Sequence, residues 1–417
     1  MLSWLKLQIA LFVGRIASSL SRILSIGSGE QIRGRVIAAL DKNALKKLAK
    51  NKDIIVISST NGKTTTTKLV SNALKNTGYK IISNEQGANQ EAGIITALAT
   101  MKNPDYCVLE VDERSLPKMF DRLQPKFLLF ANLSRDQLDR FGEVSSISKS
   151  WKEMLKDFDG YIIANACDPN IVFSCLGAKN AHVSWVPINS SWHNDSYSCP
   201  NCGSLLNYFE DSSFNCSSCT FSTPSSLENV SDSLIKDISN NLNLPGKWNV
   251  NNAIISYYLL KNIDNDLRDD QLFKSFSELS SVSGRNEIFD LKNDKQVQLF
   301  LAKNPAGWNE TLNHINEANN TGLIFAFNCN IADGKDPSWL YDVDFESINQ
   351  ENIYVFGERS VDMATRLMIA GKNPMLTNDL DEALANSQFD FNLLVASYTQ
   401  FLKLSRNLAK GGRNEKN

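Results

Sequence analysis

The sequence predicts an α/β protein: a central parallel sheet with a phosphate-binding loop and a cysteine-containing insertion, followed by a smaller Rossmann-like α/β domain. Three observations predict this class. Apolar strand-like runs alternate with helical stretches from about residue 50 to residue 165, a glycine-containing turn with a Lys-Thr pair follows the first run, and a second alternating series begins near residue 284. Near-continuous apolar strands that alternate with helices are typical of parallel sheets covered by helices on both faces.

The first 45 residues precede this pattern and are expected to form a helical segment. The apolar run from Leu2 to Val13 is followed by Arg15 and Arg22, so it stays short of the roughly 18 apolar residues of a membrane span. It also lacks the small-residue cleavage site of an export signal. An amphipathic helix fits better, and packing on the body of the protein is favoured over contact with a membrane surface or a partner.

Composition restricts the class of function. The 417 residues carry a net charge of −3, with 42% hydrophobic and 21% charged residues, which is typical of a globular protein with room for two or three domains. A broad nucleic-acid-binding surface would need clustered positive charge, so no nucleic acid partner is expected. Four of the eight cysteines lie in one short segment, unlike those of a disulfide scaffold, which indicates a reducing, cytoplasmic setting.

The expected strands define the expected domains. Residues 46–283 form the central domain, with strands Ile54–Ser58, Tyr79–Ser83, Tyr106–Val111, Phe127–Asn132 and Gly160–Asn165. A Ser- and Asn-rich stretch at 186–243 is expected to be an insertion into this domain. After a hinge-like segment at 281–285, residues 284–417 form the second domain, with strands Val297–Ala302, Thr321–Phe327, Asn352–Phe356 and Phe391–Ala396.

The turn after the first strand is the most informative motif. Residues 58–65 read Ser-Ser-Thr-Asn-Gly-Lys-Thr-Thr. Backbone N–H groups and a helix N-terminus can face a phosphate here, the Lys adds charge, and a Thr hydroxyl can hold Mg²⁺. The candidate ATP-binding residues are Thr60, Asn61, Gly62, Lys63, Thr64 and Thr65, with Thr64 also as a Mg²⁺ ligand. The general pattern has a glycine where this chain has Ile57, so an ordinary strand–turn–helix corner is the alternative.

Phosphate chemistry with Mg²⁺ also requires carboxylates. Glu110 ends an expected strand at the same edge of the sheet and is the candidate ligand for the ion and the nucleotide site. Asp112 and Glu113 follow directly, so the choice among these carboxylates stays open, as does a plain surface cluster. A second acidic group, within residues 135–140, follows the strand that ends at Asn132, and its alternative is a solvated turn of paired charges.

The cysteine-rich insertion predicts a metal site. Cys199 and Cys202 form one C-x₂-C knuckle, and Cys216 and Cys219 form another after thirteen intervening residues. Two such knuckles on neighbouring hairpins can place four thiolates around a structural Zn²⁺. The expected zinc ribbon spans about residues 195–223 and would stabilise the insertion, because four protein ligands leave no position open for catalysis. A redox dithiol pair is the alternative.

Three further segments carry weaker signals. Asn249 and Asn252 lie at i and i+3 of an expected helix, where their amides could read the edge of a nucleobase or cap the helix. Arg285 in the hinge-like segment could reach a terminal phosphate on domain closure or form an inter-domain ion pair. The loop at 330–339 contains Asp, Gly and Pro and by itself predicts a turn.

Taken in order, these motifs resemble the Mur ligases, the ATP-dependent enzymes of peptidoglycan assembly. The resemblance rests on Thr60–Thr65, Glu110, Asp136–Asp139, Gly246–Asn252 and Gly284–Arg285. The cysteine cluster, Leu301–Asn309 and Asp333–Trp339 make the chain similar to the Mur ligase-like subunit of lipid II isoglutaminyl synthase. The resemblance covers nearly the whole chain from about residue 30.

This resemblance implies a carbon–nitrogen ligase with glutamine as amido donor. The α-carboxylate of D-glutamate in the lipid II stem peptide would be activated by ATP as an acyl phosphate and attacked by ammonia, giving D-isoglutamine. Because the sequence shows no Cys–His nucleophile arrangement, glutamine hydrolysis is expected on a partner chain, a GatD-like glutamine amidotransferase, in a heterodimer. By resemblance, Asp336 is the catalytic residue that completes the Cys–His–Asp triad of that partner. A lipid-linked substrate would suit a position at the inner face of the cytoplasmic membrane.

Three residues depart from the Mur ligase pattern: Ser59 stands in place of Gly, and Gln137 and Trp248 each stand in place of His. Gln137 weakens the case for a second Mg²⁺ site, and Trp248 leaves Asn249 and Asn252 as the candidate base contacts. No carbamylated lysine is assigned, although lysines at 149 and 152 lie nearby. The alternative functions are a Mur-type ligase that adds an amino acid and a zinc-stapled nucleotide-binding scaffold.

Overall fold

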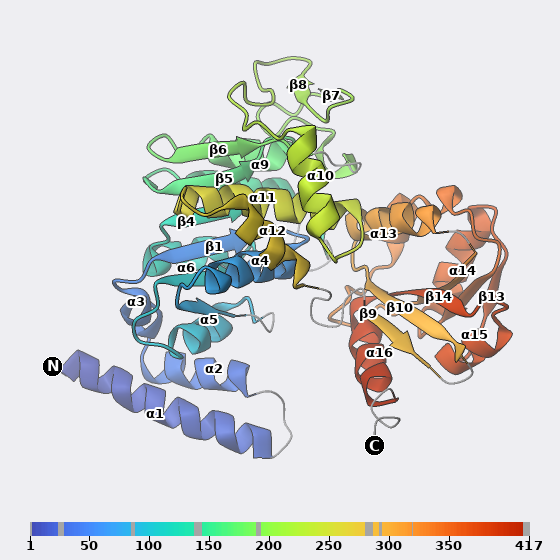
Figure 1. Ribbon diagram of the computed structural model, residues 1–417, viewed down its shortest axis with the longest axis horizontal. Coiled ribbons are helices and arrows are strands. Elements are labelled where there is room, and N and C mark those ends of the chain that lie inside the picture. The colour runs from blue at the N-terminus through green and yellow to red at the C-terminus, as the bar shows by residue number, and fades with distance from the viewer. Residues whose placement is uncertain are drawn as a thin grey trace.

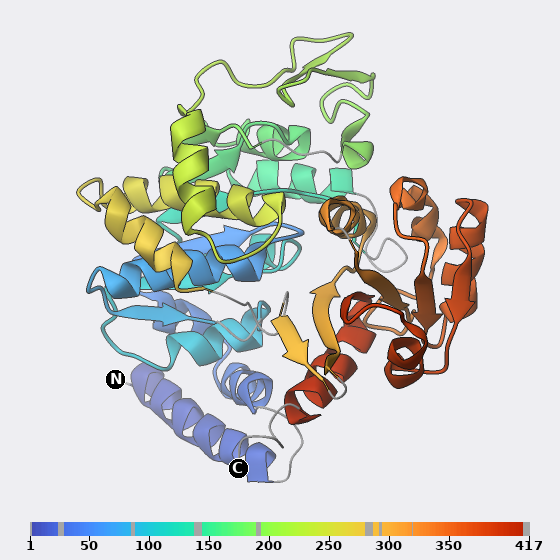
Figure 2. The same ribbon diagram turned by 45° about the vertical axis from the view of Figure 1, so that its right-hand side comes forward.

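Two six-stranded sheets organise the chain, one in each half of the molecule (Figures 1 and 2). The computed structural model describes residues 2–23, 29–84, 88–136, 144–188, 193–279, 287–291, 294–318 and 320–411. Arg285 and residues 137–140, which were candidate site elements, lie outside the described residues.

The first sheet is parallel throughout, with the strand order β2-β3-β1-β4-β5-β6. Its strands are β1 (Ile54–Ser58), β2 (Ile81–Ser83), β3 (Tyr106–Glu110), β4 (Phe127–Phe130), β5 (Tyr161–Asn165) and β6 (His182–Val186). Every residue of β1 is buried, because the strand lies in the middle of the sheet with helices on both faces. The predicted parallel sheet is therefore confirmed.

Helices cover both faces of this sheet (Figure 1). Ile55 and Ile57 pack into a core with α4 (Lys63–Asn76), α10 (Asp232–Asn241), α11 (Lys247–Ile263) and α12 (Asp269–Ser277). Ile54 and Val56 point to the other face, which carries α2 (Glu30–Leu40), α3 (Ala44–Ala49), α5 (Glu91–Leu98), α6 (Leu116–Leu123), α8 (Val144–Met154) and α9 (Pro169–Cys175). The helix α1 (Leu2–Ile23) packs on α2 at the edge of the molecule. Within the described part of the chain, no helix combines the length and apolarity needed to cross a membrane.

The second sheet has the order β13-β12-β11-β14-β10-β9. Its strands are β9 (Glu287–Asp290), β10 (Gln296–Leu301), β11 (Gly322–Ala326), β12 (Ile353–Phe356), β13 (Pro374–Leu376) and β14 (Phe391–Ala396). One face packs against α13 (Pro305–Glu317) and α14 (Ser360–Ile369), and the other against α15 (Leu380–Asn386) and α16 (Tyr398–Gly411). The sheet is parallel except at β9, which runs antiparallel to β10.

Three edge strands were missing from the sequence-based prediction: β6, β9 and β13. Each has a neighbouring strand of its sheet on one side only, and each is less apolar or more exposed than the central strands. Pro374 begins β13, a position that an edge strand tolerates because proline donates no ladder hydrogen bond. The continuous apolar pattern that identified the central strands is therefore weak at the edges of both sheets.

The insertion after β6 contains a small antiparallel hairpin of β7 (Leu206–Tyr208) and β8 (Phe214–Cys216). It has its own core, in which Phe214 and Phe221 pack against Phe173 of α9. The hairpin stands at one end of the first sheet, beyond β6 (Figure 1). The cysteine-containing segment thus forms a small hairpin that packs on α9 at this end of the sheet.

Candidate active site

The loop between β1 and α4 has the shape of a phosphate-binding loop. Gly62 has φ = 82°, a left-handed conformation that other residues rarely adopt, and Lys63 begins α4 directly after it. A Cβ atom at position 62 would lie 2.5 Å from Oδ1 of Asn252. Glycine is therefore required by both the backbone and the neighbouring side chain, and the N-terminus of α4 is left open to an anion.

The segment after β4 holds this loop in place. The backbone N–H of Thr60 donates to the carbonyl of Asn132 (2.9 Å), and the Asn132 amide pairs with the N–H and the carbonyl of Asn61 (2.9 and 3.0 Å). The Thr60 hydroxyl donates to the carbonyl of Ser134 and accepts its N–H. Since β4 is the direct neighbour of β1, the order of strands fixes the shape of the loop.

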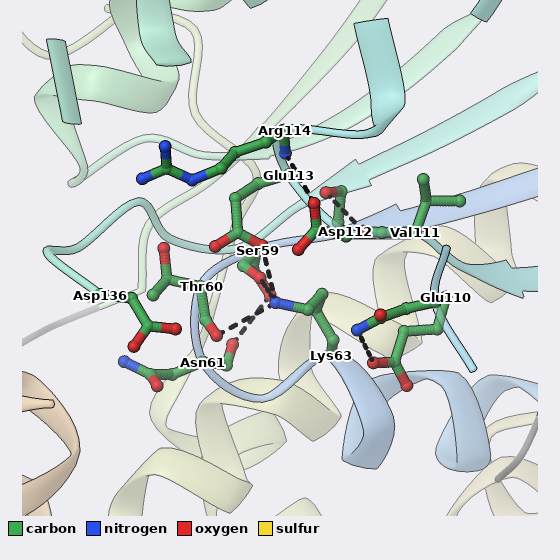
Figure 3. Close-up of polar contacts among 12 residues, drawn as sticks. Ser59, Thr60, Asn61, Lys63, Glu110, Val111, Asp112, Glu113, Arg114 and Asp136 are labelled. Atoms are coloured by element: carbon green, nitrogen blue, oxygen red, sulfur yellow. Dashed lines mark hydrogen bonds and ion pairs between the residues drawn. The ribbon is translucent and has the colours of Figure 1, made fainter. Parts of the chain in front are cut away.

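Lys63 lies at the centre of the site, with its ammonium group turned toward Ser59, Thr60 and Glu113 (Figure 3). The ammonium has three N–H donors, and they meet the carbonyl oxygens of Ser59 and Thr60 (3.1 Å for Thr60) and Oε2 of Glu113 (2.9 Å). The two charged side chains are only 8% and 6% exposed. Burial acts to raise the pKa of the Glu113 carboxyl, but the charges of Lys63 and Lys303 outweigh it and hold that pKa below its usual value.

Glu110 provides a second buried carboxylate beside the loop, at the end of β3. Its backbone N–H and carbonyl both pair with the Asn84 amide (2.8 Å each), and Oε1 accepts from Nδ2 of Asn89 (3.1 Å). Its other oxygen, Oε2, is buried and has no hydrogen-bond partner among the described residues. Buried polar atoms are almost always satisfied, so this oxygen suits a hard cation such as Mg²⁺.

The candidate nucleotide residues share one cavity of about 530 Å³. Its lining includes Thr60, Asn61, Gly62, Lys63, Thr64, Thr65, Glu110, Asn249 and Asn252. The amide of Asn249 also donates to the carbonyl of Pro245 (2.6 Å), so part of this side chain braces the turn before α11. Asn252 lies against the phosphate loop at Gly62. The structure therefore brings together all the described residues that were predicted to bind the nucleotide.

The second half of the molecule supplies the opposite wall of this cavity, with residues such as Lys303, Gly307 and Thr311. The side-chain amides of Asn304 and Asn61 exchange hydrogen bonds of 3.1 and 3.3 Å across the boundary. Nζ of Lys303 lies 2.6 Å from Oδ2 of Asp136. The cavity is therefore a cleft between two units that are joined by polar contacts at the phosphate loop.

Arg135 and Asp136, the described residues of the acidic segment, form ion pairs and are partly buried. Arg135 pairs with Asp195 and with Asp342 (3.0 Å), which belongs to the second half of the molecule. Asp136 pairs with Lys303, while its other carboxylate oxygen, Oδ1, is buried without a hydrogen-bond partner in the described part of the chain. In Figure 3, Asp136 lies beside Asn61, on the opposite side of Lys63 from Glu110.

Asp168 lies in the wall of the same cavity and caps α9. Its Oδ1 accepts the N–H groups of Asn170 (2.8 Å) and Ile171 (3.2 Å), and its Oδ2 accepts that of Leu133 (2.8 Å). Partial burial in the cavity wall raises the pKa of Asp168 to about 6, although the three N–H donors act in the opposite direction. The side chain ties the end of β4 to the beginning of α9.

Asp336 lies apart from the cavity. It is exposed, it is absent from the cavity lining, and its Oδ1 accepts the N–H of Ser338 (2.9 Å). The nearby Asp333 is buried and accepts hydrogen bonds from the N–H and hydroxyl of Thr399 (2.7 and 2.6 Å) and from the N–H of Asn330 (2.9 Å). Asp333 therefore fastens the loop to the start of α16, and Asp336 is the carboxylate presented to solvent.

The four clustered cysteines meet as predicted from their spacing. Their Sγ atoms all lie within 4.8 Å of one another, with 3.8 Å between Cys199 and Cys219 and 3.4 Å between Cys202 and Cys216. A tetrahedral Zn²⁺ with Zn–S bonds of about 2.3 Å separates its sulfur ligands by about 3.8 Å. The cluster could therefore hold one such ion with four protein ligands.

Three residues of the site were not selected from the sequence. Glu113 was considered only as an alternative to Glu110 for a metal ion, whereas the structure uses it to neutralise Lys63. Lys303 and Asn304 were used to recognise the family but received no role. The signal for them was the Lys-Asn-Pro sequence directly after a strand, because Asn304 caps α13 by accepting the N–H of Gly307 (2.9 Å).

Comparison with known proteins agrees with this arrangement. Residues 57–260 match the Mur ligase middle domain, and residues 301–401 match the MurT ligase C-terminal domain. The chain is 31% identical to the MurT subunit of the glutamine-hydrolysing lipid II isoglutaminyl synthase of Staphylococcus aureus (strain N315). That match covers 96% of this chain and 97% of the relative.

Solved structures share the fold. A pseudomurein peptide ligase type C from Methanothermus fervidus superposes with a TM-score of 0.64 at 19% identity, covering 86% of this chain and 79% of that one. MurF ligase from Thermotoga maritima, solved in complex with ADP, gives a TM-score of 0.61 at 14% identity, covering 91% and 84%. At such identities the likeness concerns the arrangement of the two sheets and their helices.

Proposed function

This chain belongs to the MurT family, and on that premise we propose that it is the synthetase subunit of a lipid II isoglutaminyl synthase. The observation that carries the proposal is the shared cavity, in which the phosphate loop, Lys63 and the buried carboxylate of Glu110 face the second half of the molecule. Such a cleft can enclose ATP on one side and a carboxylate substrate on the other.

The first half of the reaction follows from these groups. An oxygen of the D-glutamate α-carboxylate in the lipid II stem peptide attacks the γ-phosphorus of ATP, an O–P bond forms, and ADP leaves. The N-terminus of α4 would stabilise the charge on the transferring phosphoryl group, and the Lys63 ammonium would do so after exchanging one of its three protein contacts for a phosphate oxygen. Thr64 and Glu110 would hold Mg²⁺, which neutralises phosphate charge when bound. Asn249 and Asn252 are the proposed contacts to the nucleotide, and Arg285 is proposed to reach its terminal phosphate.

The second half requires ammonia. It attacks the acyl carbon, phosphate leaves, and loss of a proton gives the amide. Glutamine hydrolysis would need a reactive thiolate, but burial raises the pKa of Cys107 and Cys329 to about 12 and that of Cys167 to about 11, and it also raises that of Cys175. These four cysteines are poor nucleophiles, and the other four are clustered as the proposed ligands of a structural metal. A GatD-like glutamine amidotransferase is therefore the proposed partner and source of ammonia.

Asp336 is proposed to complete the Cys–His–Asp triad of that partner. Its exposure outside the nucleotide cavity supports this role, because a carboxylate that orients a histidine on another chain must be reachable from solvent. The buried Asp333 holds this loop against the start of α16 by accepting hydrogen bonds from Thr399. The Cys₄ cluster is proposed to bind a structural Zn²⁺ that stabilises the insertion.

Reconstitution tests this function against a ligase that adds an amino acid. With the partner, the chain should convert lipid II to its D-isoglutamine form from glutamine and ATP, as followed by mass analysis of the product. With free ammonia it should consume ATP without the partner, and Lys63→Ala should abolish this turnover while the exposed-surface variant Lys156→Ala keeps it. Efficient joining of a free amino acid to a precursor would exclude the amidation proposal, and ammonia-dependent turnover that survives in Lys63→Ala would exclude this site.

A further inference from the structure

Helix α1 carries an exposed apolar stripe along its whole length. The exposed side chains include Trp4 (65% exposed), Phe12 (64%) and Ile23 (77%), together with Leu5, Ile9, Val13, Ile16 and Leu20. At 3.6 residues per turn, Leu5, Ile9, Phe12, Ile16, Leu20 and Ile23 fall within an arc of about 80°, and at 1.5 Å per residue the stripe is about 27 Å long. Single exposed apolar residues are ordinary, but a continuous stripe of this length marks an interaction site.

The opposite side of α1 already makes the contacts that hold the helix on the protein. Leu7 and Ala10 are buried in the core on that side, and a Cβ atom at Gly14 would lie 2.7 Å from Cγ1 of Ile37 in α2. The absence of a side chain at Gly14 thus allows α1 and α2 to approach closely. Because this inner face accounts for the packing of α1, the outer stripe is not needed for the fold.

The charges of α1 have one sign. The helix contains Lys6, Arg15 and Arg22 and no Asp or Glu. Lys6 and Arg15 are exposed and flank the stripe on its two sides. Helix α16, which carries the exposed residues Lys403 and Arg406, runs toward the same lower side of the molecule as α1 in both views (Figures 1 and 2). An apolar stripe between cations is complementary to an anionic lipid surface.

We propose that α1 is a membrane-surface anchor that lies in the interface of an anionic bilayer, with Phe12 and Ile16 at the middle of the buried stripe. The inference rests in part on the proposed function, since a lipid-linked substrate lies in a membrane. An anchored enzyme would then encounter this substrate by diffusion in the plane of the membrane.

Vesicle flotation of the full chain tests the anchor. The protein should float with vesicles of phosphatidylglycerol and phosphatidylcholine, and much less with phosphatidylcholine alone. The double variant Phe12→Gln with Ile16→Gln, which removes two large apolar side chains, should lower the vesicle partition coefficient by a factor of about ten or more. Lys6→Gln with Arg15→Gln should weaken binding to the anionic vesicles about 30-fold, at about 1 kcal/mol per cation. The matched control is Val361→Gln with Met368→Gln, which removes exposed apolar residues from α14 and should leave partition unchanged.

Specific outcomes overturn the proposal. Wild-type protein that stays unbound, or a Phe12/Ile16 variant that floats like wild type with an unchanged thermal midpoint, would do so. A wild-type dimer that becomes monomeric in this variant would assign the stripe to a second copy, and loss of the complex with the amidotransferase would assign it to that partner. Retained amidation of a water-soluble stem-peptide substrate, with loss of vesicle binding, supports the anchor. Failure of wild type to amidate any substrate would remove the proposed function while leaving the vesicle result intact.

Discussion

The buried pair of Lys63 and Glu113 should be strongly coupled, and the change that tests it is Glu113→Gln. The substitution keeps the shape of the side chain and removes its charge. The Lys63 ammonium would then keep two backbone carbonyl oxygens and lose its only carboxylate contact among the described residues. Trp151, whose indole N–H donates to the backbone carbonyl of Glu113 (2.8 Å), would be unaffected.

The magnitude follows from burial. Both side chains are less than a tenth exposed, and removing one partner of a buried ion pair costs roughly 3–5 kcal/mol because the remaining charge has no compensation. We expect about 3 kcal/mol, because Lys63 keeps its two carbonyl partners, and a domain of this size then loses about 6–12 °C of its thermal midpoint. The control is Glu91→Gln. Glu91 and Arg122 are 38% and 29% exposed, so this change should cost less than about 1 kcal/mol.

The assay is chemical and thermal unfolding of the two single variants Glu113→Gln and Lys63→Met and of the double variant. The double variant should be more stable than the sum of the single effects predicts, by about 2 kcal/mol, whereas additivity within about 0.5 kcal/mol would refute the coupling. The pH dependence has a defined sign. Since the pKa of Glu113 is lowered in the folded protein, its contribution is present above its unfolded pKa and is lost as pH falls through the folded pKa. A wild-type advantage over Glu113→Gln that grows on acidification would contradict this.

Three further predictions concern other parts of the structure. Treatment with a chelator, or the variant Cys202→Ser, should release about one metal ion per chain, as measured by metal analysis. Residues 197–221 should then become open to proteolysis, as followed by mass spectrometry. An unchanged digestion pattern would exclude a structural metal. Burial raises the pKa of Asp168 to about 6, so the wild-type protein loses stability as pH rises from the unfolded pKa toward that value. The free energy of unfolding of Asp168→Asn should therefore improve relative to wild type by up to about 3 kcal/mol between about pH 4 and pH 7. A difference between the two proteins that does not change with pH would show that the folded pKa is not raised. Asn304→Ala and Asp379→Ala each remove a helix cap and should each cost about 1 kcal/mol of stability. Only Asn304→Ala should lower ATP turnover, because Asn304 contacts the phosphate loop and Asp379 does not. Equal ATP turnover in both variants would count against the role of that contact.

The loop at 60–65 and the cysteine cluster could be predicted from the sequence because each is encoded within a short segment. A buried strand followed by Asn-Gly-Lys-Thr specifies a tight turn and a helix start locally, and the observed Gly62 conformation agrees with it. The two C-x₂-C knuckles similarly need only a hairpin to meet. The central strands were found because burial on both faces makes them continuously apolar. The edge strands β6, β9 and β13 were missed because exposure relaxes that pattern.

Contacts between distant segments were decided by the tertiary structure alone. Glu113 reaches Lys63 because β3 is paired with β1, and Asp136 reaches Lys303 because the second half of the molecule closes over the end of β4. Asn61 and Asn304 meet for the same reason. In the sequence, Glu110, Asp112 and Glu113 are three carboxylates close to the end of one strand, and the choice among them stayed open. The folded chain gives Glu110 a buried oxygen without a hydrogen-bond partner among the described residues and pairs Glu113 with Lys63. The physical reason is that local propensity and burial set the elements, whereas strand order and packing set which charges share a cavity.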